Sequence, residues 1–184
     1  LVAAKAGMEA LAQHVDSLIV IPNDKLMMVL GNDISMLDAF KAANDILYGA
    51  VAGIAEVINC PGLVNVDFAD VKTVMSEMGM AMMGSAIAAG VDRARVAAER
   101  AVASPLLEDV SLSGARGILV NITASSSLKM REVQEVMSAV KNVIAEDAAI
   151  IVGTVIDEEI GDDLRVTMVA TGLGSPSQSQ STPL

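Results

Sequence analysis

One long amphipathic segment, residues 35–59, constrains the fold of this chain more than any other feature. Its apolar side chains recur at the period of an α-helix and share one stripe, made by Leu37, Phe40, Ile46, Leu47, Val51, Ile54 and Ile58. Ser35, with Asp38 three residues later, has the spacing of an N-terminal helix cap. A helix over these residues is about 36 Å long, which is enough to cross a whole domain.

The other segments alternate between helical and strand patterns. Before the long helix we expect a helix over residues 1–14, a strand over 17–21 and a short helix through Met27, Met28 and Leu30. After it we expect, in order, helix 67–78, strand 80–89, helix 92–104, strand 117–123, helix 128–144 and strands 149–156 and 164–171. The acidic turn 157–163 joins the last two strands, so we expect them to form a hairpin.

This order predicts an α/β (α+β) fold, a small mixed sheet with helices packed on it. The single strand 17–21 cannot make a sheet alone, so the part before the long helix is expected to be the end of another domain. The chain begins in what looks like the middle of a helix and lacks an initiator Met, which suggests a fragment. The Ser-, Gln- and Pro-rich tail over 172–184 is expected to be disordered.

Composition excludes several classes of function. The chain is 53% hydrophobic but has one Tyr, two Phe and no Trp, so we expect an aliphatic core in which the twelve Met residues fill gaps. A net charge of -11 without a basic stripe disfavours a nucleic-acid partner. Cys60 and His14 are each alone, which excludes a disulfide framework and a zinc site and suits a reducing cytoplasm. The most apolar run, 78–91, is too short and glycine-rich to span a bilayer.

An amide and two carboxylates cluster where a new helix is expected to begin. Asn65, Asp67 and Asp70 follow the Pro61-Gly62 break within six residues. One interpretation is structural, because Asp67 and Asp70 have the spacing of a helix cap and complement the helix dipole. The other is functional, because a short loop with these groups can hold a water molecule and accept its proton. The functional interpretation requires another surface to bring an electrophile to the loop.

An ordered series of segments resembles the FtsZ family, the cell-division branch of the tubulin-like GTPases. The series is VDSLIVIPNDKL over residues 15–26, DAFKAAND over 38–45, NVDFADV over 65–71, SPLLE over 104–108, ARGILVNIT over 115–123 and VTMVATG over 166–172. The resemblance covers nearly all of residues 1–174. It implies a nucleotide-binding domain ending at residue 34, a central helix over 35–59, a carboxy-terminal GTPase-activating domain with a four-stranded sheet over 60–172, and a linker over 173–184.

The resemblance also implies roles for the acidic cluster. Asn65, Asp67 and Asp70 match the family's synergy loop, which enters the nucleotide site of a neighbouring subunit and completes its hydrolytic site. Asp67 and Asp70 would orient and polarise the water that attacks the γ-phosphate, and Asn65 would help to place the loop. Positioning and electrostatics carry most of phosphoryl transfer, which suits a loop supplied by another subunit.

Asn23, Phe40 and Asn44 match the family's guanine contacts. Phe40 and Asn44 are one helical turn apart and share a face, so the ring could cover the base while the amide bonds its edge. Each residue also has a plain structural interpretation: Phe40 as core packing, Asn44 as an exposed helix residue, and Asn23 as a turn residue or helix cap.

The implied cofactor is GTP or GDP, with Mg²⁺ accompanying GTP in the full-length polymer and no metal site of the chain's own. The family's glycine-rich phosphate loop is absent, and no Gly-Gly pair occurs in the sequence. We therefore expect this chain alone neither to bind nucleotide tightly nor to hydrolyse it.

The implied partners are further subunits of the same protein, together with division regulators and membrane-tethering proteins. No nucleic acid and no direct membrane insertion are expected, and the implied location is the cytoplasmic division septum at mid-cell. Two alternatives stay open. One is a non-catalytic domain that caps filaments or docks regulators, and the other is an unrelated small-molecule-binding α/β domain.

Overall fold

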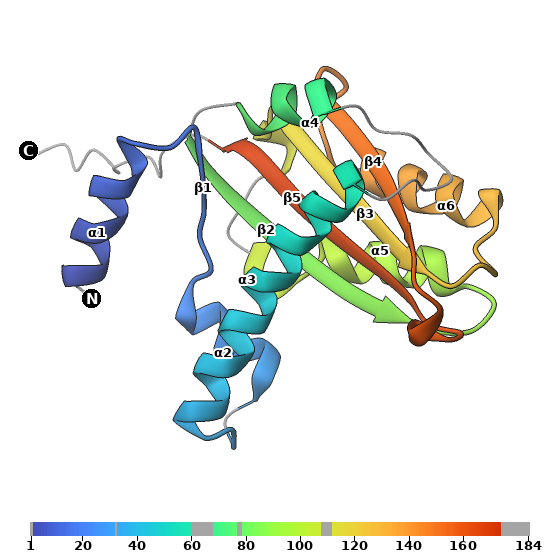
Figure 1. Cartoon of the computed structure of the whole chain (residues 1–184), viewed down its shortest axis with the longest axis horizontal. Helices are drawn as coiled ribbons and strands as arrows, with labels where there is room; N and C mark the ends of the chain where they lie inside the picture. Colours follow the sequence, from blue (N-terminus) through green and yellow to red (C-terminus); the bar gives the residue numbers. More distant parts are fainter. Residues whose placement is uncertain (1, 32, 60–67, 77–78, 108–111, 174–184) are drawn as a thin grey trace, which may run out of the picture.

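A five-stranded mixed sheet organises the chain, with helices on both of its faces (Figure 1). The structure is a computed structural model that describes residues 2–31, 33–59, 68–76, 79–107 and 112–173. Its helices are α1 (Val2–Ala12), α2 (Asn23–Leu30), α3 (Met36–Asn59), α4 (Phe68–Met75), α5 (Arg93–Val102) and α6 (Met130–Lys141). Its strands are β1 (Ser17–Ile19), β2 (Gly79–Ala88), β3 (Gly117–Ala124), β4 (Ala149–Ile156) and β5 (Leu164–Leu173). The predicted helices and strands are thus confirmed within the described residues, most with shorter ends. The predicted disorder of the tail is wrong for Gly172 and Leu173, which end β5, and residues 174–184 lie outside the described residues.

The strands lie in the order β1-β2-β5-β3-β4. β1 is parallel to β2, β3 is parallel to β4, and β5 runs antiparallel to both of its neighbours. The predicted α/β class with a mixed sheet is confirmed. The sheet has one strand more than the four expected, because Ser17–Ile19 pairs with the free edge of β2. The domain boundaries given above stay predictions.

The predicted hairpin of the last two strands is wrong. β5 lies between β2 and β3, whereas β4 pairs with the outer edge of β3. β5 is buried along most of its length, with Leu164, Val166 and Met168 fully covered, as is typical of a strand with a neighbour on each edge. β4 instead follows β3 through α6, and such a helical crossover leads to a parallel neighbour.

Helices α5 and α6 cover one face of the sheet. This face holds the larger hydrophobic cluster, to which β3 contributes the fully buried Ile118, Val120 and Ile122. α5 contacts the sheet through an alanine stripe, made by Ala94, Ala97, Ala98 and Ala101, each with no exposed surface. Gly84 on β2 faces this helix, and a Cβ there would collide with the backbone carbonyl oxygen of Ala101. Small side chains therefore set a short distance between α5 and the sheet.

A buried ion pair joins α5 to α6. The Arg93 Nε atom donates to Glu132 Oε2 at 2.6 Å, and Arg93 Nη2 donates to Glu132 Oε1 at 3.0 Å. Arg93 also donates to the Asp162 carbonyl oxygen at 2.9 Å and to Ser127 Oγ at 3.3 Å. The hydrogen bond from Arg93 is the main cause that holds the pKa of the Glu132 carboxyl below its ordinary value of 4.5, against the opposing effect of burial.

Helices α3 and α4 lie on the opposite face of the sheet. The second hydrophobic cluster is there, with Ala50 from α3, Val74 from α4 and Met83, Leu119 and Val169 from the strands. The predicted cap of α3 is confirmed, because the Asp38 amide donates to Ser35 Oγ at 3.1 Å and the Ser35 hydroxyl donates to Asp38 Oδ2 at 2.7 Å.

Only part of the predicted apolar stripe of α3 is buried. Ile46 and Ile54 pack against the second cluster, whereas Leu37, Phe40 and Val51 are exposed. The amino-terminal part of α3 extends beyond the sheet, together with α2 (Figure 1).

Candidate functional site

Helix α4 presents Asp70 at one end of the sheet. Asp70 lies in the first turn of α4 and is exposed, while Val71 and Val74 are buried. The helix rests against β3 and β4. Asn65 and Asp67 lie outside the described residues, so the loop that carries them stays a prediction. Within the described part, Asp70 is therefore the candidate acid, and it faces solvent.

Helix α4 packs on the sheet at Thr171 and Gly117, two residues that the sequence analysis did not single out. The Thr171 hydroxyl donates to the Val74 carbonyl oxygen at 2.8 Å, and both residues are almost completely buried. Gly117, the first residue of β3, lies under the same contact. The sequence signal was weak, since it consists only of a Gly at the start of one strand and a Thr near the end of another.

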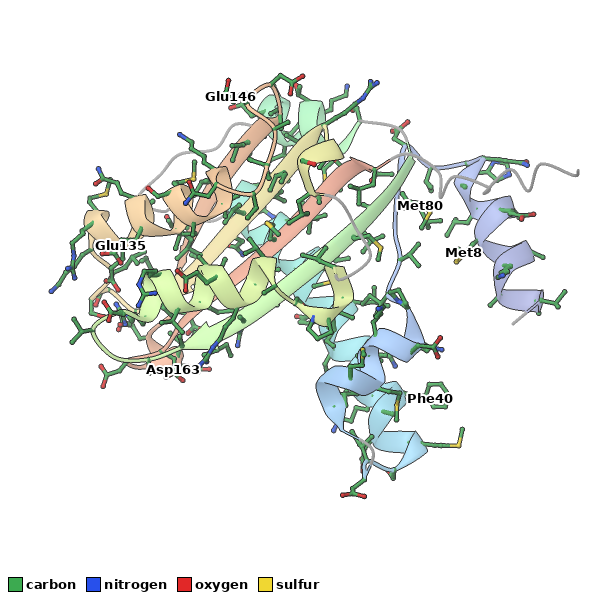
Figure 2. All side chains as sticks on the ribbon, turned by 180° about the vertical axis from the view of Figure 1, so that it is seen from behind. Met8, Phe40, Met80, Glu135, Glu146 and Asp163 are labelled. Atoms are coloured by element: carbon green, nitrogen blue, oxygen red, sulfur yellow. The ribbon has the colours of Figure 1, made fainter. Side chains whose placement is uncertain are left out.

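The predicted guanine contacts lie on α2 and α3. Asn23 is the first residue of α2 and is exposed; Pro22 is the cap residue, so the alternative interpretation of Asn23 as a cap is wrong. Phe40 is 59% exposed and Asn44 is exposed on the next turn of α3. Figure 2 shows Phe40 on the part of α3 that lies beyond the sheet. The described residues of this chain therefore do not bury Phe40, and its role in contacting guanine stays a prediction.

The two candidate sets lie at opposite ends of α3. Phe40 is in the second turn of the helix, whereas α4 follows its carboxy-terminal end. The helix axis from Phe40 to Asn59 measures about 28 Å, from the rise per residue of an α-helix. Within one chain, therefore, the structure does not bring Asp70 together with the residues predicted to contact guanine.

A cavity of about 350 Å³ lies between the middle of α3 and the sheet. Polar side chains from the strands line it, namely Ser85, Asn121, Thr123, Arg165 and Thr167. Asn121 is 5% exposed and its Nδ2 donates to the Gly53 carbonyl oxygen at 3.3 Å, while its Oδ1 has no hydrogen-bond partner. Gly53 fits tightly here, because a Cβ would lie 2.9 Å from Asn121 Nδ2. The sequence analysis did not predict this cavity.

Metal ligands do not cluster in the described part of the chain. Across residues 2–31, 33–59, 68–76, 79–107 and 112–173, His, Cys, Asp and Glu side chains form no group of three that could hold a metal ion. Over the same ranges, no helix has the length and apolar character needed to cross a membrane.

Solved structures define the class to which this fold belongs. A GTPγS-bound protofilament of CetZ2 from Haloferax volcanii superposes with a TM-score of 0.65 at 18% identity, covering 92% of this chain and 50% of that one. A similarity at this identity concerns the fold alone. An FtsZ mutant from M. jannaschii superposes with a TM-score of 0.86 at 42% identity, covering 91% of this chain and 50% of that one. The class is thus that of tubulin-like proteins.

Sequence comparison narrows the class to one family. The profile described as FtsZ family, C-terminal domain, matches residues 79–174, just over half of the chain. The chain is 61% identical over 172 residues to the cell division protein FtsZ of Coxiella burnetii, covering 94% of this chain and 45% of the relative. The protein of the same name from Pseudomonas aeruginosa is 58% identical over 172 residues, with 94% and 44% covered. The chain belongs to the FtsZ family. It spans about half the length of the curated relatives it matches.

Proposed function

We propose that this chain is the activating half of a cell-division GTPase whose subunits polymerise head to tail. The relatives from Coxiella burnetii and Pseudomonas aeruginosa are cell division proteins, and the structure of an empty FtsZ dimer from M. jannaschii superposes with a TM-score of 0.85. In this proposal the polymer is the cytokinetic ring, which assembles in the cytoplasm at the mid-cell septum.

The observation that carries the proposal is the separation of the two candidate sets along α3. Asp70 follows one end of the helix, and Phe40 and Asn44 lie near its other end, about 28 Å from Asn59 along the axis. A nucleotide held by Phe40 and Asn44 is out of reach of Asp70 of the same chain. A head-to-tail contact between copies places different surfaces against each other and repeats without closing. It would bring the end of one subunit that carries Asp70, here called the acidic end, to the end of the next that carries Phe40 and Asn44, here called the base-binding end.

The acidic end then supplies groups for water attack. In the proposal, Asp67 and Asp70 orient the attacking water and draw its proton, while Asn65 holds the loop on the nucleotide. The exposure of Asp70 leaves its carboxylate free to meet a neighbouring subunit. Mg²⁺ bound with GTP supplies charge neutralisation at the phosphates. The protein residues contribute position and electrostatics, which dominate phosphoryl transfer.

The base-binding end contributes recognition of guanine. The exposed ring of Phe40 covers one face of the base, and the Asn44 amide, one helical turn away, bonds its edge. Asn23 adds a further amide from α2, which packs beside α3. The sequence has no Gly-Gly pair for a phosphate loop, so this chain alone holds nucleotide weakly and does not hydrolyse it.

Paired inactive variants of the full-length protein test the proposal. Asp70→Ala and Asp67→Ala should each abolish GTP turnover while GTP binding remains, and Phe40→Ala with Asn44→Ala should weaken GTP binding. At a GTP concentration too low to occupy the weakened pocket, a 1:1 mixture of Asp70→Ala subunits with the base-contact variant should recover about one quarter of wild-type turnover, because a quarter of head-to-tail contacts then join an intact pocket to an intact loop. No recovery in mixed filaments, or wild-type turnover by Asp70→Ala alone, would count against action between subunits.

A second candidate is a docking function, favoured by the exposed apolar side chains on α3. Met36, Leu37 and Tyr48 are each at least 75% exposed. Large exposed apolar side chains are available for contact with a partner, and division regulators or membrane tethers are the partners that the family resemblance implies. Addition of this chain to filaments of the full-length protein distinguishes the activating function from the docking function. Shortened filaments with unchanged turnover per contact support docking or capping, and unchanged filament lengths contradict docking or capping.

A further inference from the structure

One buried hydroxyl holds α4 on the end of the sheet. Thr171 has no exposed surface, and its hydroxyl lies 2.8 Å from the Val74 carbonyl oxygen and 3.3 Å from that of Gly117. A hydroxyl has one hydrogen to donate, so the shorter contact is the principal bond. The Val74 carbonyl belongs to the last turn of α4, where carbonyl groups have no partner inside the helix. Thr171 supplies that partner from β5.

Gly117 lets the helix sit directly on the strand backbone. A Cβ at this position would lie 2.6 Å from Thr171 Oγ1 and 2.9 Å from Val74 Cγ1. Both distances are shorter than van der Waals contact, so no side chain fits between α4 and the start of β3. The absence of a side chain at Gly117 thus preserves the hydrogen bond between Thr171 and Val74.

Thr171 and Gly172 together form a bulge in β5. Met80 pairs with Leu173 and Met82 with Ala170, so β5 carries one extra residue at this point. Gly172 has a φ of 67°, a left-handed conformation that glycine adopts without strain. Bulges redirect side chains next to functional sites, and this one includes the residue that bonds to α4.

The position of α4 depends on these contacts. The helix has eight residues, and a helix of this length is not stable on its own in water. Its buried side chains Val71 and Val74 provide apolar contact, which has no preferred direction, whereas the bond from Thr171 is directional. Asp70 lies one helical turn before Val74, about 6 Å along that axis. A tilt at Val74 is therefore passed to Asp70.

We propose that Thr171 is a positioning residue for GTP hydrolysis, because its bond to Val74 fixes the direction in which α4 presents Asp70 to the neighbouring subunit. This inference rests on the function proposed above. A displacement of about 1 Å at a reacting group can lower a rate on the order of 100-fold. Removal of the hydroxyl alone, with the shape retained, should therefore lower kcat about tenfold and leave GTP binding unchanged.

The test uses the full-length protein with Thr171→Val, Thr171→Ser and a control, Thr154→Val. The control removes another buried hydroxyl, that of Thr154 on β4. Thr154 pairs with Ile122 of β3, which is five residues along that strand from Gly117, so the control lies away from α4. GTP turnover per assembled subunit, KM, GTP affinity and the critical concentration for assembly are measured for each variant. We expect Thr171→Val to lose about tenfold in kcat with KM, affinity and critical concentration within about twofold of wild type, and Thr171→Ser to recover most of the rate.

Wild-type kcat in Thr171→Val would overturn the inference. So would a loss of assembly that accounts for the whole loss of turnover, or an equal loss of kcat in Thr154→Val, since either result indicates a purely structural role. Asp70→Ala, measured in parallel, separates the two proposals. An inactive Asp70→Ala beside a fully active Thr171→Val refutes the role of Thr171 alone, whereas a fully active Asp70→Ala refutes the proposed function.

Discussion

Replacement of Arg93 by Ala should be among the most destabilising single substitutions in this chain. The Arg93 and Glu132 side chains are 8% and 5% exposed, and two hydrogen bonds join them. Without the guanidinium, Glu132 keeps only its bond from the Lys129 amide at 3.0 Å and remains as a buried, unpaired charge. Breaking a buried pair in this way costs about 3–5 kcal/mol, a large share of the 5–15 kcal/mol of free energy of unfolding typical of a domain.

An exposed pair on the same helix provides the matched control. Arg95 lies 3.2 Å from Glu99 with both side chains more than half exposed, and such a pair contributes about 0.3–0.5 kcal/mol. Urea unfolding of both variants is followed by far-ultraviolet circular dichroism, because the chain has no Trp and a single Tyr. The same titration of Arg93→Met combined with Glu132→Leu should recover most of the loss, since the unpaired charge is then gone.

The reasoning is refuted if Arg93→Ala lowers the free energy of unfolding by no more than Arg95→Ala does. It is also refuted if the double substitution is as unstable as Arg93→Ala. The first result would mean that water reaches Glu132, and the second that packing rather than charge dominates this region.

Three further predictions concern the ion pair, the close packing and the helix cap. The pKa of Glu132 is lowered in the folded chain, so its stabilising contribution is fully present above pH 4.5 and is lost as the pH falls through the lowered pKa. The difference in free energy of unfolding between wild type and Glu132→Gln should therefore shrink only below pH 4.5. A difference independent of pH would contradict the charged state of Glu132 in the folded chain. Gly84→Ala should lower the free energy of unfolding by about 1–3 kcal/mol, because the new methyl group collides with the Ala101 carbonyl. Gly49→Ala, in open space on α3, should raise it by roughly 0.5–1 kcal/mol, because alanine favours the helix over glycine. Equal Tm values for these two variants would show that α5 can move away from the sheet. Ser35→Ala should cost about 1 kcal/mol in thermal unfolding, and Ser35→Asp, which retains a capping oxygen, should lose less.

Local patterns predicted the elements of this fold but not all of their pairing. The helix over 35–59 and the strand over 117–123 follow from apolar periodicity, a property of neighbouring residues, and both are confirmed. The hairpin of β4 and β5 was inferred from their short connection, and it is wrong because β5 is needed at the centre of the sheet. The strand–helix–strand order of β3, α6 and β4 did carry the correct signal for a parallel pair.

The candidate site was predictable only where single residues carry a motif. Asp70, Phe40 and Asn44 lie on the helices expected for them and are exposed, and their roles stay predictions. Thr171 was missed because its contact with Val74 spans 97 residues of sequence, and no local pattern reports such a contact. The Arg93–Glu132 pair, 39 residues apart, was missed for the same reason.

The bulge at Gly172 also determines which face the last side chain of β5 points to. Two residues apart in a regular strand, Thr171 and Leu173 would face the same way, yet Thr171 bonds to α4 while Leu173 joins the cluster beneath α5 and α6. Gly172 is the extra residue that keeps them on opposite faces. Its deletion would make Thr171 and Leu173 adjacent in a regular strand, where neighbouring side chains alternate, so both would keep their environments. A one-residue gap at any regular position of β5 would instead turn every following side chain to the other face, so alignments and chimaeras should place a gap in this strand at Gly172 alone.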